Sequence, residues 1–332
     1  MGEVRIGTSG WSYPAGAGTW NGLFYPLRAD PGSRGRVDEL AYYAQFFDTV
    51  EVNSTFYRQP SAPVTRRWVA RTPPGFEFSV KLFQKLTHPV PVGRGVPDPA
   101  RPAVPDEAAV PAVPEGAQAD VDEFRAGVDP IEASGKLGAV LAQFPPGFKN
   151  GERARDYLAW LLRALKGYQV AVELRHRSWS DASRATSALL EESGAAWVQI
   201  DEPKFQFSIR QTFRPNVPGC YYMRLHGRNA AKWWQHDTPD ERYNYLYSLE
   251  ELEPIAGVTA AARKDVRKAY LYLNNHFAAK AVVNATILKH QLGEPISGEY
   301  PPTLVEAYPE LRGIVSVRQA GPPRRLPWDT DR

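Results

Sequence analysis

Residues 170–179 read VAVELRHRSW, and this stretch shows the pattern on which the fold depends. Its first six residues alternate valine or leucine with alanine, glutamate and arginine, which predicts a strand with one apolar and one polar face. A helical segment over residues 181–192 follows this strand. A strand followed by a helix is the repeating unit of a parallel sheet, so the stretch is interpreted as one βα unit.

Similar short runs, rich in β-branched or aromatic residues, recur along the chain. The predicted strands cover residues 4–9, 49–53, 76–81, 139–144, 169–175, 197–201, 221–226 and 269–274. Helical segments are expected at residues 37–47, 62–71, 121–133, 152–165, 181–192, 240–262 and 276–292. Eight βα units favour an α/β protein with a single (β/α)8 barrel of the TIM type over two doubly wound domains.

Two proline-rich stretches depart from this pattern. The predicted barrel spans residues 1–295 and carries a proline-rich insertion at residues 89–118, after the third strand. Such a composition favours an extended excursion on the surface. Residues 296–332 form an irregular C-terminal tail that is expected to pack on the barrel, with one short helix near residues 304–308.

Composition and charge exclude several classes of protein. The chain has 332 residues, of which 43% are hydrophobic and 23% charged, values that argue against fibrous or broadly disordered proteins. Lys and Arg number 40 and Asp and Glu 37, so the net charge of +3 is too small for a general nucleic-acid or membrane coat.

Cysteine content and the lack of targeting signals indicate where in the cell the protein is expected. Cys220 is the single cysteine, so no internal disulfide can form. No apolar run approaches the roughly 20 residues that a membrane helix needs, and the opening residues MGEVRIGTSGW lack the pattern of a signal peptide. We therefore expect a cytoplasmic protein that does not associate with membranes.

Ionisable side chains collect near the carboxyl ends of the predicted strands, where barrel enzymes place their chemistry. Buried charges are costly unless they are paired, so this collection indicates either an internal network of ion pairs or a functional site. The candidate catalytic residues are Glu51, Lys81, Glu173 and His226. The candidate substrate-binding residues are Trp11, Tyr13, Asn53, Tyr57, Gln143, Arg175, His176, Trp179, Asp201, Arg224, Arg228, Asn274 and Asn275. No residue is assigned as a metal ligand.

The aromatic candidates in this set stand in loops after strands. They can form a stacking surface for a base or a sugar ring, or they can pack between loops. Residues 204–209 alternate apolar and polar side chains, which predicts a small hairpin over the rim of the barrel.

Several familiar sites are missing from the sequence. Gly16, Gly18 and Gly22 do not have the spacing of a dinucleotide-binding loop, and the chain has no P-loop, HExxH or CxxC motif. The run GTSGW at residues 7–11 lacks the final glycine of a nucleophile elbow, which disfavours a serine hydrolase. No nucleotide cofactor is therefore predicted.

The remaining residues fit an anionic ligand best. Arginine binds phosphate with a planar fork, lysine adds a point charge, and histidine can donate a proton near neutral pH. We expect phosphate to bind at Arg224, His226 and the start of the last helix, with Asn275 as a candidate cap of that helix. The expected partner is a small phosphate-bearing ligand, and a nucleic acid fits the same chemistry; the oligomeric state stays open.

Three functions remain open at this point. Hydrolysis of a phosphoester is the leading interpretation, with a non-catalytic module that binds anions or nucleotides as its alternative. A glycoside hydrolase using Glu51 and Glu173 is the third, although nearby cations would hold both carboxyl groups ionised.

Phosphoester hydrolysis has two candidate mechanisms. In the first, one or two divalent metals are held by Glu51, Glu173, Asp201 and His226. In the second, no metal is needed, because Lys81 and Arg175 neutralise the phosphate while Glu173 or His226 handles a proton.

Longer stretches of the chain resemble a known family. They read GTSGWSY at residues 7–13, VEVNSTFYRQP at 50–60, FSVKLFQKLTH at 78–88, LAQFPPGF at 141–148, VAVELRHRSW at 170–179, YMRLHGRN at 222–229 and YLYLNNHFAAKAVVNA at 270–285. Together they are similar to the YecE-like family, the domain of unknown function seventy-two, over residues 2–292. The resemblance implies a barrel of the TIM type and implies no particular reaction. The proline-rich insertion is longer than the resemblance leads us to expect.

Overall fold

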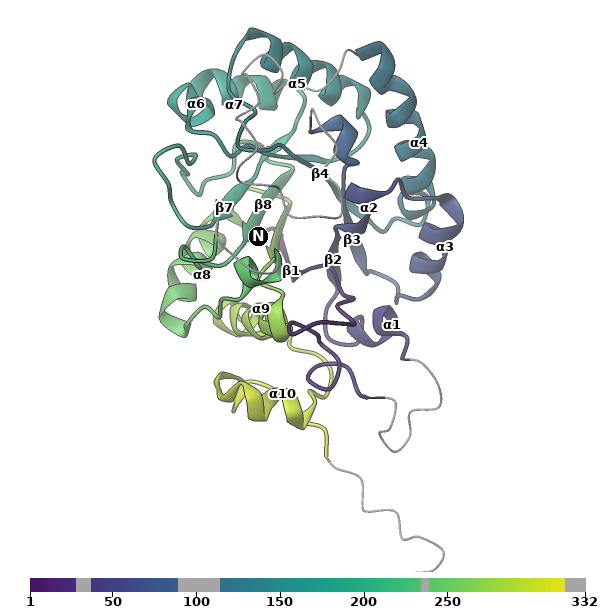
Figure 1. Cartoon of the computed structure of the whole chain (residues 1–332), viewed down its shortest axis with the longest axis vertical. Coiled ribbons are helices and arrows are strands. Elements are labelled where there is room, and N and C mark those ends of the chain that lie inside the picture. The colour runs from purple at the N-terminus through teal and green to yellow at the C-terminus, as the bar shows by residue number, and fades with distance from the viewer. Residues whose placement is uncertain (28–36, 89–113, 234–238, 320–332) are drawn as a thin grey trace, which may run out of the picture.

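A ring of parallel strands, covered on its outside by helices, forms the body of the molecule (Figure 1). The computed structural model describes residues 1–27, 37–88, 114–233 and 239–319. The strands are β1 (Glu3–Ser9), β2 (Thr49–Val52), β3 (Glu77–Lys81), β4 (Leu137–Gln143), β5 (Val170–Glu173), β6 (Ala196–Trp197), β7 (Gln199–Asp201), β8 (Cys220–Leu225) and β9 (Lys268–Leu273). Each of the predicted strands is present.

The sixth predicted strand is divided, and its two parts complete the ring. The strand order in the sheet is β6-β5-β4-β3-β2-β1-β9-β8-β7, so β6 pairs with β5 at one edge and β7 pairs with β8 at the other. Val198 lies between the two parts, and its N–H donates to the carbonyl of Val172 at 2.9 Å. The predicted fold class, a barrel of the TIM type, is confirmed.

Each predicted helical segment contains an α-helix, although several bounds differ, and the short helices at residues 54–57 and 177–181 were not predicted. The α-helices are α1 (Glu39–Tyr43), α2 (Ser54–Tyr57), α3 (Ala62–Ala70), α4 (Pro114–Ala133), α5 (Glu152–Ala164), α6 (Arg177–Asp181), α7 (Ser183–Glu192), α8 (Leu249–Ala262), α9 (Lys280–Leu292) and α10 (Pro302–Ala307). Short 3-10 turns are η1 (Gln84–Leu86), η3 (Pro239–Tyr243), η4 (Phe277–Ala279) and η5 (Pro309–Leu311). The helix predicted at residues 240–262 is shorter, because a capping box of Ser248 and Glu251 starts α8.

The two proline-rich stretches are described only in part. Residues 89–113 of the predicted insertion lie outside the described residues, and its last five, 114–118, belong to α4 instead of the insertion. The described part of the tail reaches residue 319 and includes α10. Tyr300, just before α10, is buried; its hydroxyl lies 2.8 Å from the Thr286 hydroxyl of α9, and its ring packs on Phe46.

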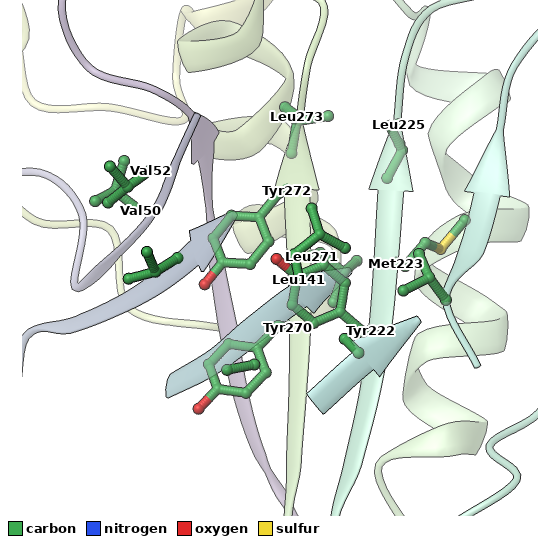
Figure 2. Packing of buried hydrophobic residues seen from close by; sticks show 14 of the residues in the cluster. Val50, Val52, Leu141, Tyr222, Met223, Leu225, Tyr270, Leu271, Tyr272 and Leu273 are labelled. Atoms are coloured by element: carbon green, nitrogen blue, oxygen red, sulfur yellow. The ribbon is translucent and has the colours of Figure 1, made fainter. Parts of the chain in front are cut away.

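Tyrosine side chains fill the middle of the barrel (Figure 2). The rings of Tyr222, Tyr270 and Tyr272 lie 5.3 to 6.2 Å apart between centroids. The Tyr272 hydroxyl is hydrogen-bonded to Thr49 and Ser79, at 2.6 and 2.9 Å. We call these three rings the tyrosine layer. It forms the floor beneath the carboxyl ends of the strands.

A separate polar network lies on the other side of the tyrosine layer, at the amino ends of the strands. Glu77 is its centre, because it accepts a hydrogen bond from the Tyr270 hydroxyl at 2.6 Å and pairs with Lys268. Arg5 lies 3.6 Å from the same carboxylate and also donates to the carbonyl of Gly75 at 2.7 Å. We call these groups the lower network.

Candidate functional site

Arg224 is the central cation above the tyrosine layer. Its side chain is 1% exposed, and its Nε and Nη2 donate to the two oxygens of Glu51 at 2.9 and 2.7 Å. Its Nη1 donates to Glu173 at 2.6 Å and to Gln143 at 3.1 Å. Each nitrogen of the guanidinium therefore has a protein acceptor, and the expected phosphate contact of Arg224 would have to displace one of them.

Glu51 is saturated with hydrogen bonds in the same way. Besides the two bonds from Arg224, it accepts one from Ser9 Oγ and one from the Tyr222 hydroxyl, both at 2.8 Å. Its side chain is fully buried. This arrangement ties β1, β2 and β8 together, and we interpret Glu51 as an internal anchor.

Glu173, at the end of β5, bridges two arginines. Its Oε1 accepts from Arg175 Nε at 2.7 Å, and its Oε2 accepts from Arg224. Burial opposes the charged form, yet Arg224 and Arg175 hold the pKa of Glu173 well below its usual range. An ionised Glu173 cannot serve as the acid of a glycoside hydrolase.

Lys81 ends β3 and is the one residue of that strand that is not fully buried. Its Nζ lies 4.0 Å above the centre of the Phe56 ring. Within the described residues, no carboxylate, carbonyl or hydroxyl accepts a hydrogen bond from this amine. Burial and the nearby Arg224, with a smaller effect of Arg175, lower the pKa of Lys81 to about 7, although Glu173 and Glu51 oppose the shift.

The outer edge of Arg175 faces His226 and Glu202. Its Nη2 lies 3.3 Å from His226 Nε2, and its Nη1 lies 3.7 Å from Glu202 Oε2, too far for a hydrogen bond. Burial lowers the pKa of His226 well below its usual range, and Arg224 and Arg175 add to that effect, so the ring is neutral. The Asn274 amide lies 2.9 Å from its Nδ1.

Glu202 is a site residue that sequence reasoning missed. It is 7% exposed, and its Oε2 has no hydrogen-bond partner in the described part of the chain. Burial raises its pKa, the charge of Glu173 raises it further, and Arg175 opposes the shift. Glu202 therefore places a carboxyl group with a raised pKa beside Arg175.

Asp201 and Arg228 meet, but on the outer side of the barrel wall. Asp201 pairs in register with Leu225, whose side chain faces the helices. Both oxygens of Asp201 accept from Arg228, at 2.9 and 2.8 Å, and one also accepts from the Tyr247 hydroxyl at 2.8 Å. The candidate metal set that included Asp201 does not converge, and no group of three or more His, Cys, Asp or Glu gathers in the described ranges.

Asn275 does not cap the last helix, which corrects that expectation. Its Nδ2 donates to the carbonyl of Tyr245 at 2.8 Å and to Asn284 Oδ1 at 2.7 Å. The residue at the N-cap of α9 is Ala279, and no side chain caps the helix there. The chain reaches α9 through two consecutive left-handed residues, Ala278 at φ +51° and Ala279 at φ +61°, so Asn275 lies too far back to cap.

Replacing Ala278 by glycine is expected to raise the free energy of unfolding by about 0.5–1 kcal/mol. Relief of the left-handed strain contributes about 1–2 kcal/mol, and the larger entropy of an unfolded glycine removes about 0.5–1 kcal/mol. Chemical denaturation measures the change. The same substitution at exposed Ala261 in α8 is the control and should destabilise; equal effects at the two positions would contradict the role of strain.

The remaining candidate substrate-binding residues lie either at the rim of the barrel or in the packed core. Tyr57 is 51% exposed, Tyr13 stacks on His276 at 4.3 Å, and Trp11 packs edge-on against Trp68 at 5.7 Å. Asn53 directly precedes α2, and its buried Oδ1 has no partner among the described residues.

Trp179 and His176 serve the fold around α6. Trp179 is fully buried, and its Nε1 donates to the carbonyl of Phe148 at 2.7 Å. His176 caps α6 by accepting from the N–H of Ser178. The hairpin expected at residues 204–209 is absent; a single bridge joins Ser208 to His176 there, because residues 206–207 turn instead of pairing.

Among the described residues, none of the helices combines the length and the apolar character needed to cross a bilayer.

Comparisons with known proteins agree with this architecture. A family model described as "Protein of unknown function DUF72" matches residues 5–305. The UPF0759 protein YunF of Bacillus subtilis (strain 168) is 26% identical over 306 residues, which cover 90% of this chain and 98% of that protein.

Two solved structures extend the comparison. A DUF72 family protein from Thermotoga maritima MSB8 is 31% identical, with a TM-score of 0.70 over 88% of this chain and 100% of that one. A DUF72 family protein from Enterococcus faecalis V583 is 22% identical, with a TM-score of 0.69 over 89% and 97% of the two chains, and shows a similar fold.

Proposed function

Because this chain belongs to the DUF72 family, whose description names no reaction, we propose a function from its own site: it is an enzyme that acts on a phosphate-bearing substrate at the carboxyl end of the barrel. The proposed reaction is hydrolysis of a phosphoester. Barrels of this type commonly bind their substrates at that end.

One observation carries the proposal: two cations reach the mouth without a carboxylate bonded to their outward nitrogens. Lys81 Nζ has no hydrogen-bond acceptor among the described residues, and the terminal nitrogens of Arg175 make no hydrogen bond to a carboxylate: Nη2 faces neutral His226, and Nη1 lies 3.7 Å from Glu202 Oε2. A poorly paired buried cation is costly, and a bound anion removes that cost. A phosphate group bound between Lys81 and Arg175 would give both cations an anionic partner.

The chemistry expected of such a site is mainly electrostatic. Phosphoryl transfer needs positioned charges more than covalent help, and the planar edge of Arg175 suits two phosphate oxygens. Glu202, whose pKa is raised by burial, supplies a proton for the leaving oxygen. Glu173 and Glu51 act behind these groups by holding Arg175 and Arg224 in place.

Phosphate is expected to stabilise the folded protein. At about 100 times its dissociation constant, a ligand that binds only the folded state adds roughly 2.7 kcal/mol. Thermal unfolding is measured with inorganic phosphate, and with sodium chloride at equal ionic strength as the control. Lys81→Met should remove most of this gain, whereas Lys85→Met should keep it, because the Lys85 side chain is 56% exposed and pairs with Asp120.

Measuring the turnover of phosphoesters distinguishes an enzyme from a module that only binds anions. Phosphate monoesters and diesters of p-nitrophenol are the first substrates to test. Stabilisation by phosphate without turnover of any ester would favour a module that binds anions. No stabilisation beyond the sodium chloride control would contradict the anion site.

A further inference from the structure

We infer that Lys81 is a nucleophile that condenses with an aldehyde or ketone group of the substrate to form an imine at the mouth of the barrel. This inference rests on the proposed function only for the phosphate site beside Arg175. It narrows the substrate class to phosphorylated aldehydes and ketones.

The backbone at Lys81 is fixed, which places its side chain. The carbonyl of Lys81 accepts a hydrogen bond from Thr55 Oγ1 at 2.6 Å, and the same hydroxyl also donates to Val52 at 3.1 Å. Phe56, on the same short helix α2, covers one side of the amine. The end of β3 therefore presents the amine from a rigid position, with one wall that excludes water.

A comparison with Lys136 shows what a structural lysine looks like in this fold. Lys136 is 8% exposed, and its Nζ donates to the carbonyls of Val69 and Thr72 at 2.9 and 2.8 Å and to the Thr72 hydroxyl at 3.0 Å. Lys81 donates to none of the described groups. Its nitrogen is thus left available for a bond to an incoming molecule.

Burial and the charge of Arg224 favour the neutral amine of Lys81, which is the form that attacks a carbonyl carbon, although Glu173 and Glu51 oppose this effect. Arg224 and Arg175 act against its protonation, and the carboxylates that could pair with it, Glu51 and Glu173, are already bonded to arginines. Lysines that are desolvated or placed beside another cation are a known means of activating an amine as a nucleophile. With a pKa of about 7, a substantial part of Lys81 is neutral at physiological pH.

The condensation balances without any oxidant or reductant. The amine nitrogen bonds to the carbonyl carbon, the carbon–oxygen π pair moves to oxygen, and a proton passes from the nitrogen to that oxygen to give a carbinolamine. A further proton, for which the carboxyl group of Glu202 with its raised pKa is the candidate donor, lets that oxygen leave as water while the nitrogen lone pair forms the carbon–nitrogen double bond. Addition of water reverses the steps and frees Lys81. A protonated imine keeps the positive charge beside the phosphate.

The test uses two aldehyde probes that differ in one group, pyridoxal 5′-phosphate and pyridoxal. The full chain is incubated with each probe near pH 7.5, the imine is reduced with sodium borohydride, and the modified lysines are identified by peptide mass spectrometry. We expect Lys81 to be modified at least tenfold faster than Lys85 by pyridoxal 5′-phosphate. Inorganic phosphate should slow this reaction.

Two variants control for the site and for folding. Lys81→Arg keeps the charge and removes the nucleophile, so the modification at this position should disappear. Lys85→Arg changes an exposed lysine and should leave the modification of Lys81 intact. Melting temperatures of both variants establish that the loss is not unfolding.

The outcomes distinguish this inference from the proposed function. Rapid labelling of Lys81 by both probes at equal rates would support the nucleophile and contradict the phosphate site. Stabilisation by phosphate, with Lys81 labelled no faster than Lys85, would support the phosphate site and overturn the nucleophile. Preference for the phosphorylated probe at Lys81 supports both.

Discussion

Replacing Glu51 by alanine is expected to lower the free energy of unfolding by about 3–5 kcal/mol, the usual cost of leaving a buried charge without its partner. Glu51 is fully buried and accepts four hydrogen bonds, of which two come from Arg224. Its removal leaves that guanidinium with Glu173 and Gln143 alone and opens a cavity above the tyrosine layer. Equilibrium unfolding in urea measures the loss.

The double variant Glu51→Ala with Arg224→Met tests the cause. Removing both charges eliminates the uncompensated cation, so the pair should be more stable than the sum of the single changes, an interaction of about 0.5–3 kcal/mol. A single variant that loses less than about 1 kcal/mol would show that water replaces Glu51 at little cost.

Replacing Glu173 by glutamine is expected to cost a similar amount near neutral pH, about 3–5 kcal/mol, because Arg224 and Arg175 both lose their charged acceptor. The loss should depend on pH in a stated direction. The pKa of Glu173 is lower in the folded protein than in the unfolded chain, where it is about 4.3. Its charge therefore stabilises the fold above that value, and the contribution fades as the pH falls toward the folded pKa.

Unfolding of the wild type and of Glu173→Gln is measured at pH 7 and at pH 3. The difference between the two proteins should be smaller at pH 3. A difference that stays constant would show that the pKa of Glu173 is the same in the folded and unfolded states. Glu173→Gln should also weaken stabilisation by phosphate, since Glu173 positions Arg175. A variant of normal stability and normal phosphate binding that still fails to turn over an ester would instead support direct catalysis by Glu173.

The strands and much of the candidate site could be predicted because both depend on short-range alternation. Polar residues on β2, β5 and β8 alternate with apolar ones, so Glu51, Glu173 and Arg224 had to face one side, and the closed ring brings them together. The alternation could not show which acceptors Arg224 binds. That depends on the stagger of strands distant in the sequence, and it determines whether Arg224 is free for a ligand.

Glu202 was missed because the sixth predicted strand, residues 197–201, has its apolar side chains toward the barrel interior and its polar ones toward the helices, the opposite of the other strands. On this strand the apolar residue Ile200 pairs with Arg224 and so faces the interior, whereas Asp201 pairs with Leu225 and faces the helices. The assumption that polar residues face the interior therefore assigns Asp201 to the site. The register with β8 assigns Glu202 instead, because Ile200 pairs with the inward-facing Arg224 and Glu202 lies two residues later, on the same side. The error came from relying on residue type where the register decides.

The tyrosine layer has a consequence for how the protein can change over evolution. It separates the lower network around Glu77 from the ion pairs of Glu51, Glu173 and Arg224, with Tyr270 bonded below and Tyr222 bonded above. Interactions between sites without shared partners are close to additive. Substitutions among Arg5, Glu77 and Lys268 can then adjust the melting point while the opposite end keeps its chemistry, so a part of the barrel's heat tolerance can change without altering its reactivity.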